Sequence, residues 1–388
     1  MDGSRSLEEI LEGCGRLVED PDFGAVSQWK EQNPGRKAVG YFPVYTPVEL
    51  IHAAGMLPVG VMGAGNRLEI AWADARFQSF VCSIVKSTLE LGLTERLQAL
   101  DGIVFHSICD PARNLASVFK RNFPHLHVEF LHFPQNMQSL RAVDYLVSEY
   151  RRVLAGLRDL TGSEVDDEEV SASIQLYNRI RGLIRSFYRF RKDQPHLLSA
   201  GETLLLVQAG TLLPPEEHLS LLEEAQEALT RREAKPKDRI AVVLEGSFCE
   251  LPPLELIQGL EEAGCYILDD DFLQGWRWFL GDVPLDGDPV RSLAEAYLNA
   301  SVYSATKHDL REPKAKHLVE KVKETGADAV MILAAKFCEP ALFDYPLYRL
   351  ALEEARIPHL FLEFEEKMWI FNRVRGEVET FVESMLFD

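Results

Sequence analysis

Apolar and polar positions follow a strand-and-helix pattern over the first third of the chain. The segment "KAVGYFPVY" predicts a buried strand that runs into "TPVELIHAAG". The second segment predicts a helix, with Thr46 as N-cap, Pro47 at the first helical position and Glu49 at the third. Gly55 ends this predicted helix. Further strands are predicted at "LPVGV", "DGIVF" and "LHVEFLHF", with helices over about 73–99 and after "DGIVF".

Later segments change the pattern and then restore it. Over 142–232 apolar residues recur at helical spacing, with little Gly or Pro, so a helical region is predicted. Near Arg239 the strand–helix alternation resumes. We therefore expect an N-terminal helical segment (1–34), a first α/β lobe (35–141), a helical region (142–236) and a second α/β lobe (237–388).

The second alternating block repeats the first in outline. "KAVGYFPVYTPVELIHAAG" resembles "RIAVVLEGSFCELPPLELIQGLEEAG", "DGIVFHSICDPARN" resembles "ADAVMILAAKFCEPALFD", and "PHLHVEFLHF" resembles "IPHLFLEFEE". These matches follow one another in the same order in both blocks, which predicts two copies of one α/β unit. Each copy is expected to be a Rossmann-like parallel sheet covered by helices on both faces.

Two cysteines occupy equivalent places in the two copies. Cys109 and Cys338 each follow a predicted strand and precede a predicted helix that starts near Pro111 or Pro340. Ligands of open parallel sheets bind beyond the carboxyl ends of the strands. A helix N-terminus also lowers the pKa of a thiol and favours the thiolate. We therefore expect Cys109 and Cys338 to be metal ligands or nucleophiles.

The other four cysteines carry weaker signals. Cys14, Cys249 and Cys265 are expected to be small apolar core residues. Cys249 lies in the turn that matches "FPVY" of the first copy, so an approach to a site stays open. Cys82, in "SFVCSIVKS", lies in a stretch predicted to be helical and is ambiguous by itself. None of the six cysteines forms a CxxC pair, which disfavours zinc ribbons and thioredoxin-like sites.

Length, net charge and missing motifs disfavour several classes of function for this chain. A length of 388 residues suits two domains of ordinary size. The formal charge of −20 disfavours binding to nucleic acid or to an anionic membrane. The acidic N-terminus and the broken apolar runs lead us to expect a cytoplasmic protein without a membrane span. "GVMGAGN" reads as a glycine turn, and the absence of a P-loop motif predicts that this chain binds no nucleotide.

Several charged residues have both an ordinary and a functional interpretation. Arg181, Arg185 and Arg189 fall on one helical face, where they either pair with nearby acids or grip the phosphates of a large anion. His106 either bonds a backbone group or donates a proton at the site. Glu49 is a weak active-site candidate, because capping explains it. The acidic run in "DDDFLQGWRWF" is compatible with a partner surface, a substrate contact or a helix cap.

Taken together, the motifs resemble the benzoyl-CoA reductase / 2-hydroxyacyl-CoA dehydratase family. The resemblance rests on Cys82 and on the segments "GYFPVYTPVELIHAAGMLPV", "CDPARN", "DDDFLQGWRWF", "KFCEPALFDYP" and "RIPHLFLEF". It extends from about Lys37 to Glu383. Within the family, the chain is most similar to the smaller, substrate-binding (C-type) subunits of the ATP-dependent reductases.

This resemblance implies a cofactor and its ligands. In the family, three cysteines hold a [4Fe–4S] cluster and leave one iron open, and their positions match Cys82, Cys109 and Cys338. The cluster would then lie in the cleft between the two lobes, because its ligands come from both. The arginine stripe of Arg181, Arg185 and Arg189 becomes a candidate for binding CoA phosphates, although no motif fixes that role.

The resemblance also implies a reaction and partners. An aromatic acyl-CoA would bind near the cluster, next to a paralogous cluster-bearing subunit. A separate iron–sulfur ATPase module would deliver single electrons. The reductase branch reduces the ring of benzoyl-CoA to a cyclic diene, whereas the dehydratase branch removes water through a ketyl radical. A water-excluding pocket is expected to be lined by aromatic side chains such as Phe77, Phe80, Trp276 and Trp278.

Two other interpretations stay open at this stage. In the first, the chain is a two-lobed small-molecule binding protein without a cluster. In the second, it is a non-catalytic partner whose cluster serves structure or electron relay.

Overall fold

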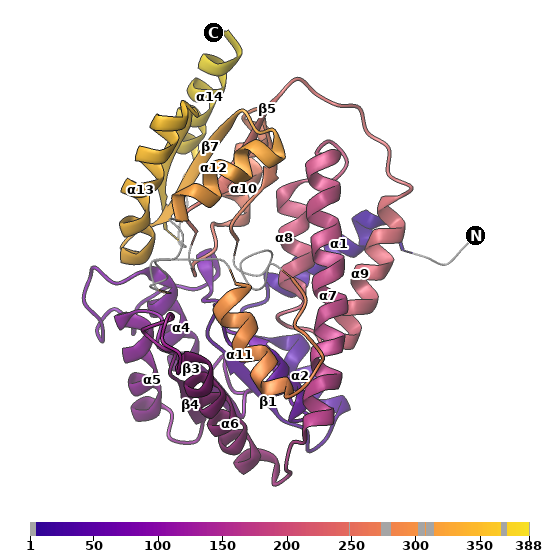
Figure 1. Ribbon diagram of the computed structural model, residues 1–388, viewed down its shortest axis with the longest axis vertical. Coiled ribbons are helices and arrows are strands. Elements are labelled where there is room, and N and C mark those ends of the chain that lie inside the picture. The colour runs from indigo at the N-terminus through magenta and orange to yellow at the C-terminus, as the bar shows by residue number, and fades with distance from the viewer. Residues whose placement is uncertain are drawn as a thin grey trace.

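The computed structural model describes residues 5–247, 249–272, 281–301, 307, 314–365 and 371–387. These residues form two four-stranded sheets, both parallel throughout, with helical segments around and between them (Figure 1). The prediction of two parallel sheets is therefore confirmed. Among the helices of the described residues, none is long and apolar enough to cross a membrane.

The two sheets have the same strand order. The first follows the order β2-β1-β3-β4 and comprises β1 (Ala38–Tyr41), β2 (Leu57–Gly60), β3 (Gly102–His106) and β4 (His127–Leu131). The second follows the order β6-β5-β7-β8 and comprises β5 (Ile240–Glu245), β6 (Cys265–Asp269), β7 (Ala329–Ala335) and β8 (His359–Phe364). In each sheet, the second strand in sequence lies on one side of the first strand, and the third strand lies on its other side. The topological switch points therefore lie between β1 and β3 and between β5 and β7, where such sheets bind ligands.

Burial explains the apolar composition of the central strands. Every residue of β3 and of β7 is buried, as expected for parallel strands with helices on both faces. The helices that pack on or beside the first sheet are α3 (Val48–Ala53), α4 (Ser83–Leu93) and α5 (Asp110–Asn122). Those of the second sheet are α10 (Leu254–Glu262), α12 (Lys314–Thr325), α13 (Glu339–Ala355) and α14 (Asn372–Phe387).

The remaining helices connect the two sheets. The predicted helical region contains α6 (Ala142–Thr161), α7 (Asp167–Asp193), α8 (Ala200–Ala209) and α9 (Pro215–Leu229). The predicted N-terminal helices are α1 (Leu7–Val18) and α2 (Gly24–Gln32). Helix α7 contacts α3 of the first half and β6 of the second.

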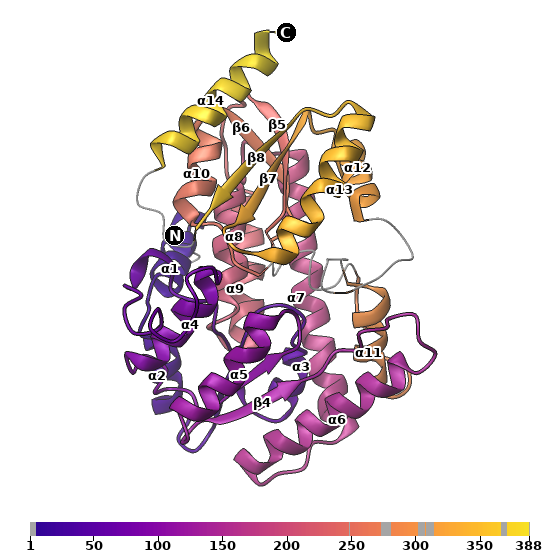
Figure 2. The ribbon, with the colours of Figure 1, turned by 90° about the vertical axis from the view of Figure 1, so that its left-hand side faces the viewer.

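Helix α11 (Pro289–Asn299) follows β6 in sequence but packs on α6 and α7 (Figure 2). Two ion pairs fix its first turn to α6: Arg151 with Asp288 at 2.9 Å and Arg291 with Asp144 at 2.7 Å. Asp288 is also its N-cap and accepts hydrogen bonds from two backbone N–H groups. An element of the second half of the chain therefore covers the first half.

Two local predictions were wrong. Within the stretch of about 73–99, where helices were predicted, only Ser83–Leu93 is an α-helix. The backbone N–H groups of Trp72 and Ala73 bond to the carboxylate of Glu90 and fold the preceding loop onto α4. This contact joins residues far enough apart in sequence that a local pattern does not reveal it.

The predicted capping box is also absent. Helix α3 begins at Val48, and its N-cap is Pro47, which makes no side-chain capping bond. The Thr46 hydroxyl instead donates to the carbonyl of Phe42 at 3.2 Å, and Glu49 pairs with Arg181. Gly55, with φ of +72°, follows the end of the helix as predicted.

Candidate functional site

Three cysteines occupy the same kind of position, the N-cap of a helix. Cys109 follows β3 and caps α5, and Cys338 follows β7 and caps α13, which confirms their predicted place at the carboxyl ends of strands. Cys82 caps α4. It was predicted to lie inside a helix, and that prediction was wrong, since the helix starts one residue later.

These three thiols lie close enough to affect one another electrostatically. The charges of Cys338 and Cys109 both raise the pKa of Cys82. Cys82 and Cys338 are buried, and Cys109 is partly buried. Because Cys82 and Cys109 belong to the first half and Cys338 to the second, the thiols converge across the two sheets.

Burial sets the acidity of these thiols. It raises the pKa of Cys109 to about 11 and holds that of Cys82 well above its ordinary value. The backbone N–H of Ala112, in the first turn of α5, opposes the shift at Cys109 without cancelling it. The predicted lowering of these pKa values by the helix N-termini was therefore wrong. A thiol binds a metal as the thiolate, so metal binding at these cysteines would release protons.

A fourth thiol belongs to the same group. Cys249, in the loop after β5, is buried, and the charges of Cys338, Cys82 and Cys109 all raise its pKa. The neighbouring residue, Glu250, accepts hydrogen bonds from the Ser83 hydroxyl and, at 3.3 Å, from the backbone N–H of Ile84. From the sequence, Cys249 was expected to be an apolar core residue, with an approach to a site left open. The tertiary contact that brings its loop to α4 has no local sequence signal.

The backbone is strained where these loops leave the sheets. Val44 and Tyr45, after β1, have φ values of 74° and 64°, and Phe337, directly before Cys338, has φ of 63°. Left-handed conformations of bulky residues cost about 1–3 kcal/mol each and concentrate at functional sites. The strain therefore marks the carboxyl edges of both sheets, and in the second sheet it lies directly before Cys338.

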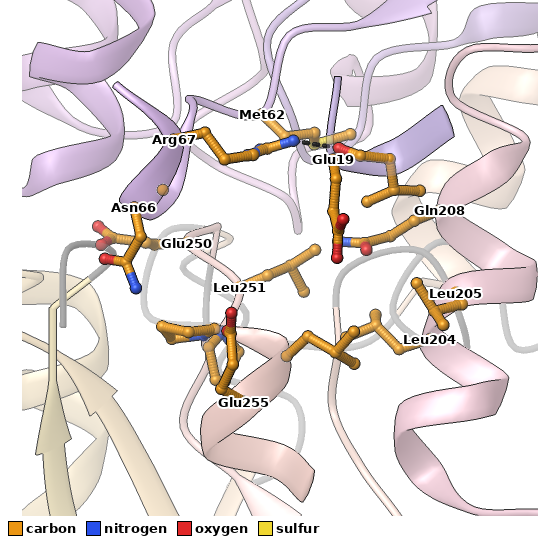
Figure 3. Close-up of a pocket in the computed structure, with 15 residues that line it drawn as sticks. Glu19, Met62, Asn66, Arg67, Leu204, Leu205, Gln208, Glu250, Leu251 and Glu255 are labelled. Atoms are coloured by element: carbon orange, nitrogen blue, oxygen red, sulfur yellow. Dashed lines mark hydrogen bonds between the residues drawn. The ribbon is translucent and has the colours of Figure 1, made fainter. Parts of the chain in front are cut away.

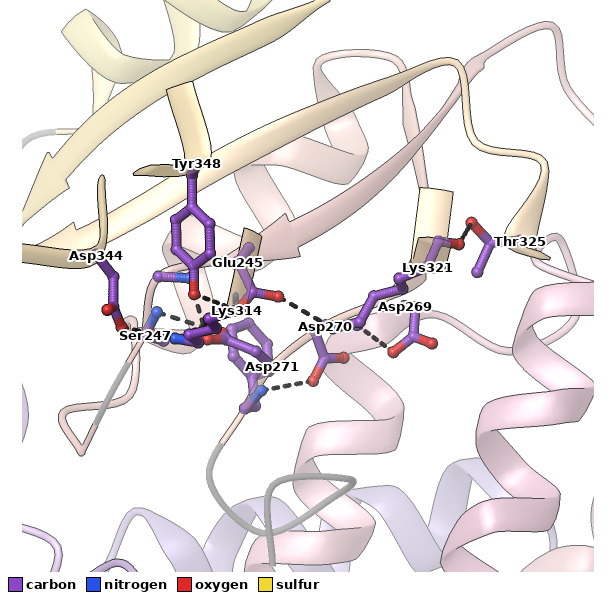
Figure 4. A network of polar contacts seen from close by, with 12 residues as sticks. Glu245, Ser247, Asp269, Asp270, Asp271, Lys314, Lys321, Thr325, Asp344 and Tyr348 are labelled. Carbon is purple, nitrogen blue, oxygen red and sulfur yellow. Dashed lines mark hydrogen bonds and ion pairs between the residues drawn. The ribbon is translucent and has the colours of Figure 1, made fainter. Parts of the chain in front are cut away.

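Buried charges support the loop that carries Cys249. The Asp271 carboxylate accepts the backbone N–H groups of Gly246 at 3.1 Å and Ser247 at 3.2 Å. At the end of β5, Glu245 pairs with Lys321 at 3.0 Å and accepts the Tyr348 hydroxyl at 3.1 Å (Figure 4). These contacts fix the loop from both sides.

Asp270 and Asp271 of the predicted acidic run are buried. Asp270 pairs with Arg191 at 2.6 Å and accepts the Tyr188 hydroxyl at 2.7 Å, and all three side chains are buried. With Asp271 bound to backbone groups, this run stabilises the fold. The rest of the motif, residues 273–280 with Trp276 and Trp278, lies outside the described residues.

The donor set suits an iron–sulfur cluster. In the described ranges, no group of three or more His, Cys, Asp or Glu side chains is placed to hold a single metal ion. A four-iron cluster is larger than an ion, and its thiolate ligands bind different irons, so these ligands stand farther apart. Thiolates are also the soft donors that such clusters require.

The two proton-donor candidates have internal partners. His106 is fully buried, its Nε2 bonds the carbonyl of Phe42 at 3.0 Å, and burial lowers its pKa to about 4. It is therefore neutral at pH 7 and makes the backbone bond of the ordinary interpretation, while its buried Nδ1 has no hydrogen-bond partner among the described residues. Its role as a proton donor stays a prediction. Glu49 is also buried and pairs with Arg181 through one carboxylate oxygen, while its Oε2 has no hydrogen-bond partner.

Two of the three arginines in the predicted stripe form ion pairs within the protein. Arg181 is buried against Glu49, and Arg185 pairs with Asp282. Arg189 is exposed. The pairing with acids is thus confirmed for two of the three residues.

An aromatic cluster covers the carboxyl edge of the first sheet. Tyr297 of α11 stacks on Phe133 with ring centroids 4.5 Å apart and meets Tyr45 edge-on at 5.3 Å. The aromatic residues named from sequence lie elsewhere: Phe77 is partly buried, and Phe80 is 65% exposed. The sequence did not reveal this cluster, because the placement of α11 is tertiary.

A cavity of about 390 Å³ opens between loops of the two halves (Figure 3). Met62, Asn66 and Arg67 line it from the first half, and Glu250 and Glu255 from the second. Because Glu250 also bonds the first turn of α4, this cavity adjoins the group of thiols.

Known proteins are similar in sequence to this chain along almost their whole length. A family model described as "2-hydroxyglutaryl-CoA dehydratase, D-component" matches residues 43–385. The C-type subunit of benzoyl-CoA reductase from Thauera aromatica is 39% identical, over 98% of this chain and 99% of that protein. The beta subunit of lactoyl-CoA dehydratase from Anaerotignum propionicum is 30% identical over 98% and 99%. The beta subunit of (R)-phenyllactyl-CoA dehydratase from Clostridium sporogenes is 28% identical over 95% and 96%. The chain therefore belongs to the benzoyl-CoA reductase / 2-hydroxyacyl-CoA dehydratase family and is an enzyme subunit of that family.

Proposed function

We propose that this chain is the iron–sulfur subunit of an ATP-dependent aromatic acyl-CoA reductase, with benzoyl-CoA as the model substrate. The observation that carries the proposal is the convergence of Cys82, Cys109 and Cys338, three helix-capping thiols drawn from both halves of the chain. The 39% identity to a benzoyl-CoA reductase subunit supports the reductase branch.

In this proposal, Cys82, Cys109 and Cys338 hold a [4Fe–4S] cluster between the two sheets. Such a cluster supplies single electrons, at potentials that reach about −700 mV in the lowest cases. The protein around the cluster contributes backbone N–H groups and buried aromatic side chains. At Cys82 and Cys109, the backbone N–H groups of Val85 and Ala112 lower the thiol pKa against the larger effect of burial and would partly offset the charge of the thiolates. The buried aromatic side chains of Tyr45, Phe133 and Tyr297 exclude water from the neighbouring edge of the first sheet.

The proposal includes a paralogous cluster-bearing subunit and a separate iron–sulfur ATPase module. An exposed apolar face on α13, the helix that Cys338 caps, supports an interface with another protein. On α13, Phe343, Leu347 and Leu350 recur at i, i+4 and i+7 and are all exposed. Exposed patches of this kind mark protein interfaces.

Iron and sulfide analysis of the anaerobically purified chain tests the cofactor. About four irons per chain are expected. The single variants Cys82→Ala, Cys109→Ala and Cys338→Ala are each expected to lose them, whereas Cys14→Ala keeps them. Full iron content in all three variants would contradict the ligand assignment.

A dehydratase is the second candidate, because the family model and two of the relatives carry that activity in their descriptions. Turnover by the complete complex separates the two. Ring reduction of benzoyl-CoA supports the reductase, and formation of an enoyl-CoA from a 2-hydroxyacyl-CoA supports the dehydratase.

A further inference from the structure

Two pockets flank the N-terminus of α4. The cavity of about 390 Å³ has Glu250 of the second half in its wall (Figure 3). A second pocket, of about 240 Å³, is lined by Ser83 of α4 and by Lys336 and Phe337 of the second half. The Ser83 hydroxyl donates a hydrogen bond to the Glu250 carboxylate. This bond therefore lies between the two pockets and separates them.

The smaller pocket borders two of the proposed cluster ligands. Cys82 directly precedes Ser83, and Cys338 directly follows Phe337. Both thiols are buried, with 6% and 4% of their surface exposed. A cluster, or the iron and sulfide that build it, reaches these thiols only if the protein around them opens. The contact between Ser83 and Glu250 is part of the wall that has to open.

The two halves are held together on the side of α7. Arg181 of this helix forms its buried ion pair with Glu49 of the first half, and Arg191 pairs with Asp270 of the second half at 2.6 Å. All four side chains are buried. Separation of such a pair leaves buried charges without partners, which is costly. The halves therefore stay together along α7 when they part elsewhere.

The ion pairs around the smaller pocket do not hold the halves together. Lys86 pairs with Asp74 at 2.8 Å, and both residues belong to the first half. Lys336 pairs with Glu365, and both belong to the second half. All four side chains line the pocket. The halves can therefore part at this pocket while both ion pairs stay intact.

The Glu250 carboxylate makes hydrogen bonds that do cross between the halves. It accepts the Ser83 hydroxyl and, at 3.3 Å, the backbone N–H of Ile84, both in the first turn of α4. Its own loop is fixed to the second half, since the Ser247 hydroxyl donates to the Glu250 carbonyl at 3.2 Å and Asp271 accepts the Ser247 N–H. A change in this one contact therefore separates two firmly held elements.

We propose that the contact between Glu250 and Ser83 is a gate through which the cluster is loaded. When the bond breaks, the two pockets join into one passage from the surface to Cys82 and Cys338, and iron and sulfide enter through it. A bound cluster, held by Cys82 of the first half and Cys338 of the second, then keeps the gate closed. This inference rests on the proposed function, because it assumes the cluster.

The test is the rate at which iodoacetamide alkylates each cysteine of the full chain without its cluster, followed by mass spectrometry. A buried thiol reacts only while the protein is locally open, so its labelling rate follows the population of the open state. The variant Ser83→Ala loses the hydroxyl and keeps the charge of Glu250, whereas Ser83→Thr keeps a hydroxyl. The matched control is Thr94→Val, since the Thr94 hydroxyl at the other end of α4 bonds the Glu90 carbonyl at 2.7 Å.

A hydrogen bond to a buried carboxylate is a strong one, so Ser83→Ala is expected to raise the labelling rates of Cys82 and Cys338 about tenfold. The initial rate of iron uptake from Fe²⁺ and sulfide should rise by a similar factor. Ser83→Thr and Thr94→Val should behave like the unaltered chain. Cys14 and Cys265, which are buried elsewhere, should be labelled at the same rate in every variant.

Unchanged labelling of Cys82 in Ser83→Ala overturns the gate. Equally faster labelling of Cys14 and Cys265 also overturns it, because the whole fold has then loosened. Faster labelling of Cys82 without faster iron uptake shows that loading takes another route and overturns the inference as well. Each of these results leaves the proposed function intact, since the unaltered chain still binds iron. A chain that takes up no iron in any variant overturns the proposed function itself.

Discussion

The Arg181 guanidinium on α7 forms a buried ion pair with the Glu49 carboxylate on α3, a residue 132 positions away in sequence. The guanidinium also donates to the side-chain carbonyl of Asn178 at 2.9 Å. Asn178 in turn contacts Val283 of the second half through its amide and its carbonyl oxygen. The pair thus connects the first lobe to the long helix that runs past both sheets.

Removal of one member of this pair leaves a buried charge without its partner. We therefore expect Glu49→Ala and Arg181→Ala each to lower the free energy of unfolding by about 3–5 kcal/mol. The double variant should cost much less than the sum of the two, because neither charge then remains alone. Urea titrations of the three variants measure these effects.

The control is an exposed pair on another helix. Arg373 and Glu377 pair at 2.9 Å on α14, and the Arg373 side chain is 88% exposed. Arg373→Ala should change the unfolding free energy by less than about 1 kcal/mol. A loss of similar size in Arg181→Ala and Arg373→Ala would contradict the importance given to the buried pair.

Buried histidines make stability depend on pH. Burial lowers the pKa of His218 to about 4, against about 6.5 in the unfolded chain, and its Nε2 bonds the Leu206 carbonyl at 3.0 Å. Between these two pH values the unfolded state binds a proton that the folded state does not, so stability falls as pH falls from 6.5 towards 4. His218 alone should lower stability by about 2 kcal/mol between pH 7 and pH 5.

The variant His218→Gln isolates this contribution. Its amide still has a donor for the Leu206 carbonyl but does not titrate. Denaturant titrations at pH 7 and pH 5 should show a smaller loss of stability in the variant than in the unaltered chain. An equal loss in both would refute the prediction. Asp269 acts in the opposite direction, since burial raises its pKa to about 6, and it is present in both proteins.

The buried carboxylate of Glu250 lies close enough to Cys82 to raise its pKa. Its negative charge disfavours the reduced state of the proposed cluster, because reduction adds a further negative charge. We therefore expect Glu250→Gln to raise the reduction potential of the cluster. Redox titration followed by EPR measures the shift. Glu255→Gln is the matched control, because Glu255 lines the same cavity but is exposed and should leave the potential unchanged.

The exposed face of α13 should bind the paired subunit. Phe343 is 71% exposed, so Phe343→Asp is expected to leave the folded chain as stable as before and to weaken its association at least tenfold. Leu140→Asp changes an even more exposed side chain outside α13 and should have no such effect. Co-purification and sedimentation of the complex measure both variants. Equal binding by Phe343→Asp and the unaltered chain would exclude this face as the interface.

The sequence was informative where function depends on repeated local patterns. Cys109 and Cys338 follow buried strands and precede proline-marked helix starts in both copies, so their positions at the sheet edges could be predicted. The parallel sheets follow from the same alternation. Repetition made these signals stronger than any single motif.

Features that depend on distant contacts were not predictable. The start of α4 at Ser83 depends on Glu90 binding the loop before it, and the approach of Cys249 depends on the bond between Ser83 and Glu250. The role of Glu49 depends on Arg181, which lies in another region of the chain. Local spacing carries no information about such partners.

The crossing of α11 has a consequence for any attempt to divide this protein. A fragment ending at residue 236 would contain every strand of the first sheet and still lack Tyr297, leaving Tyr45 and Phe133 exposed to water. It would also lose the acid partner of Arg151. Such a fragment should aggregate, and a fragment starting at residue 237 should carry a helix with nothing to pack against. The two halves are interlocked through α11, so neither should fold as an independent module.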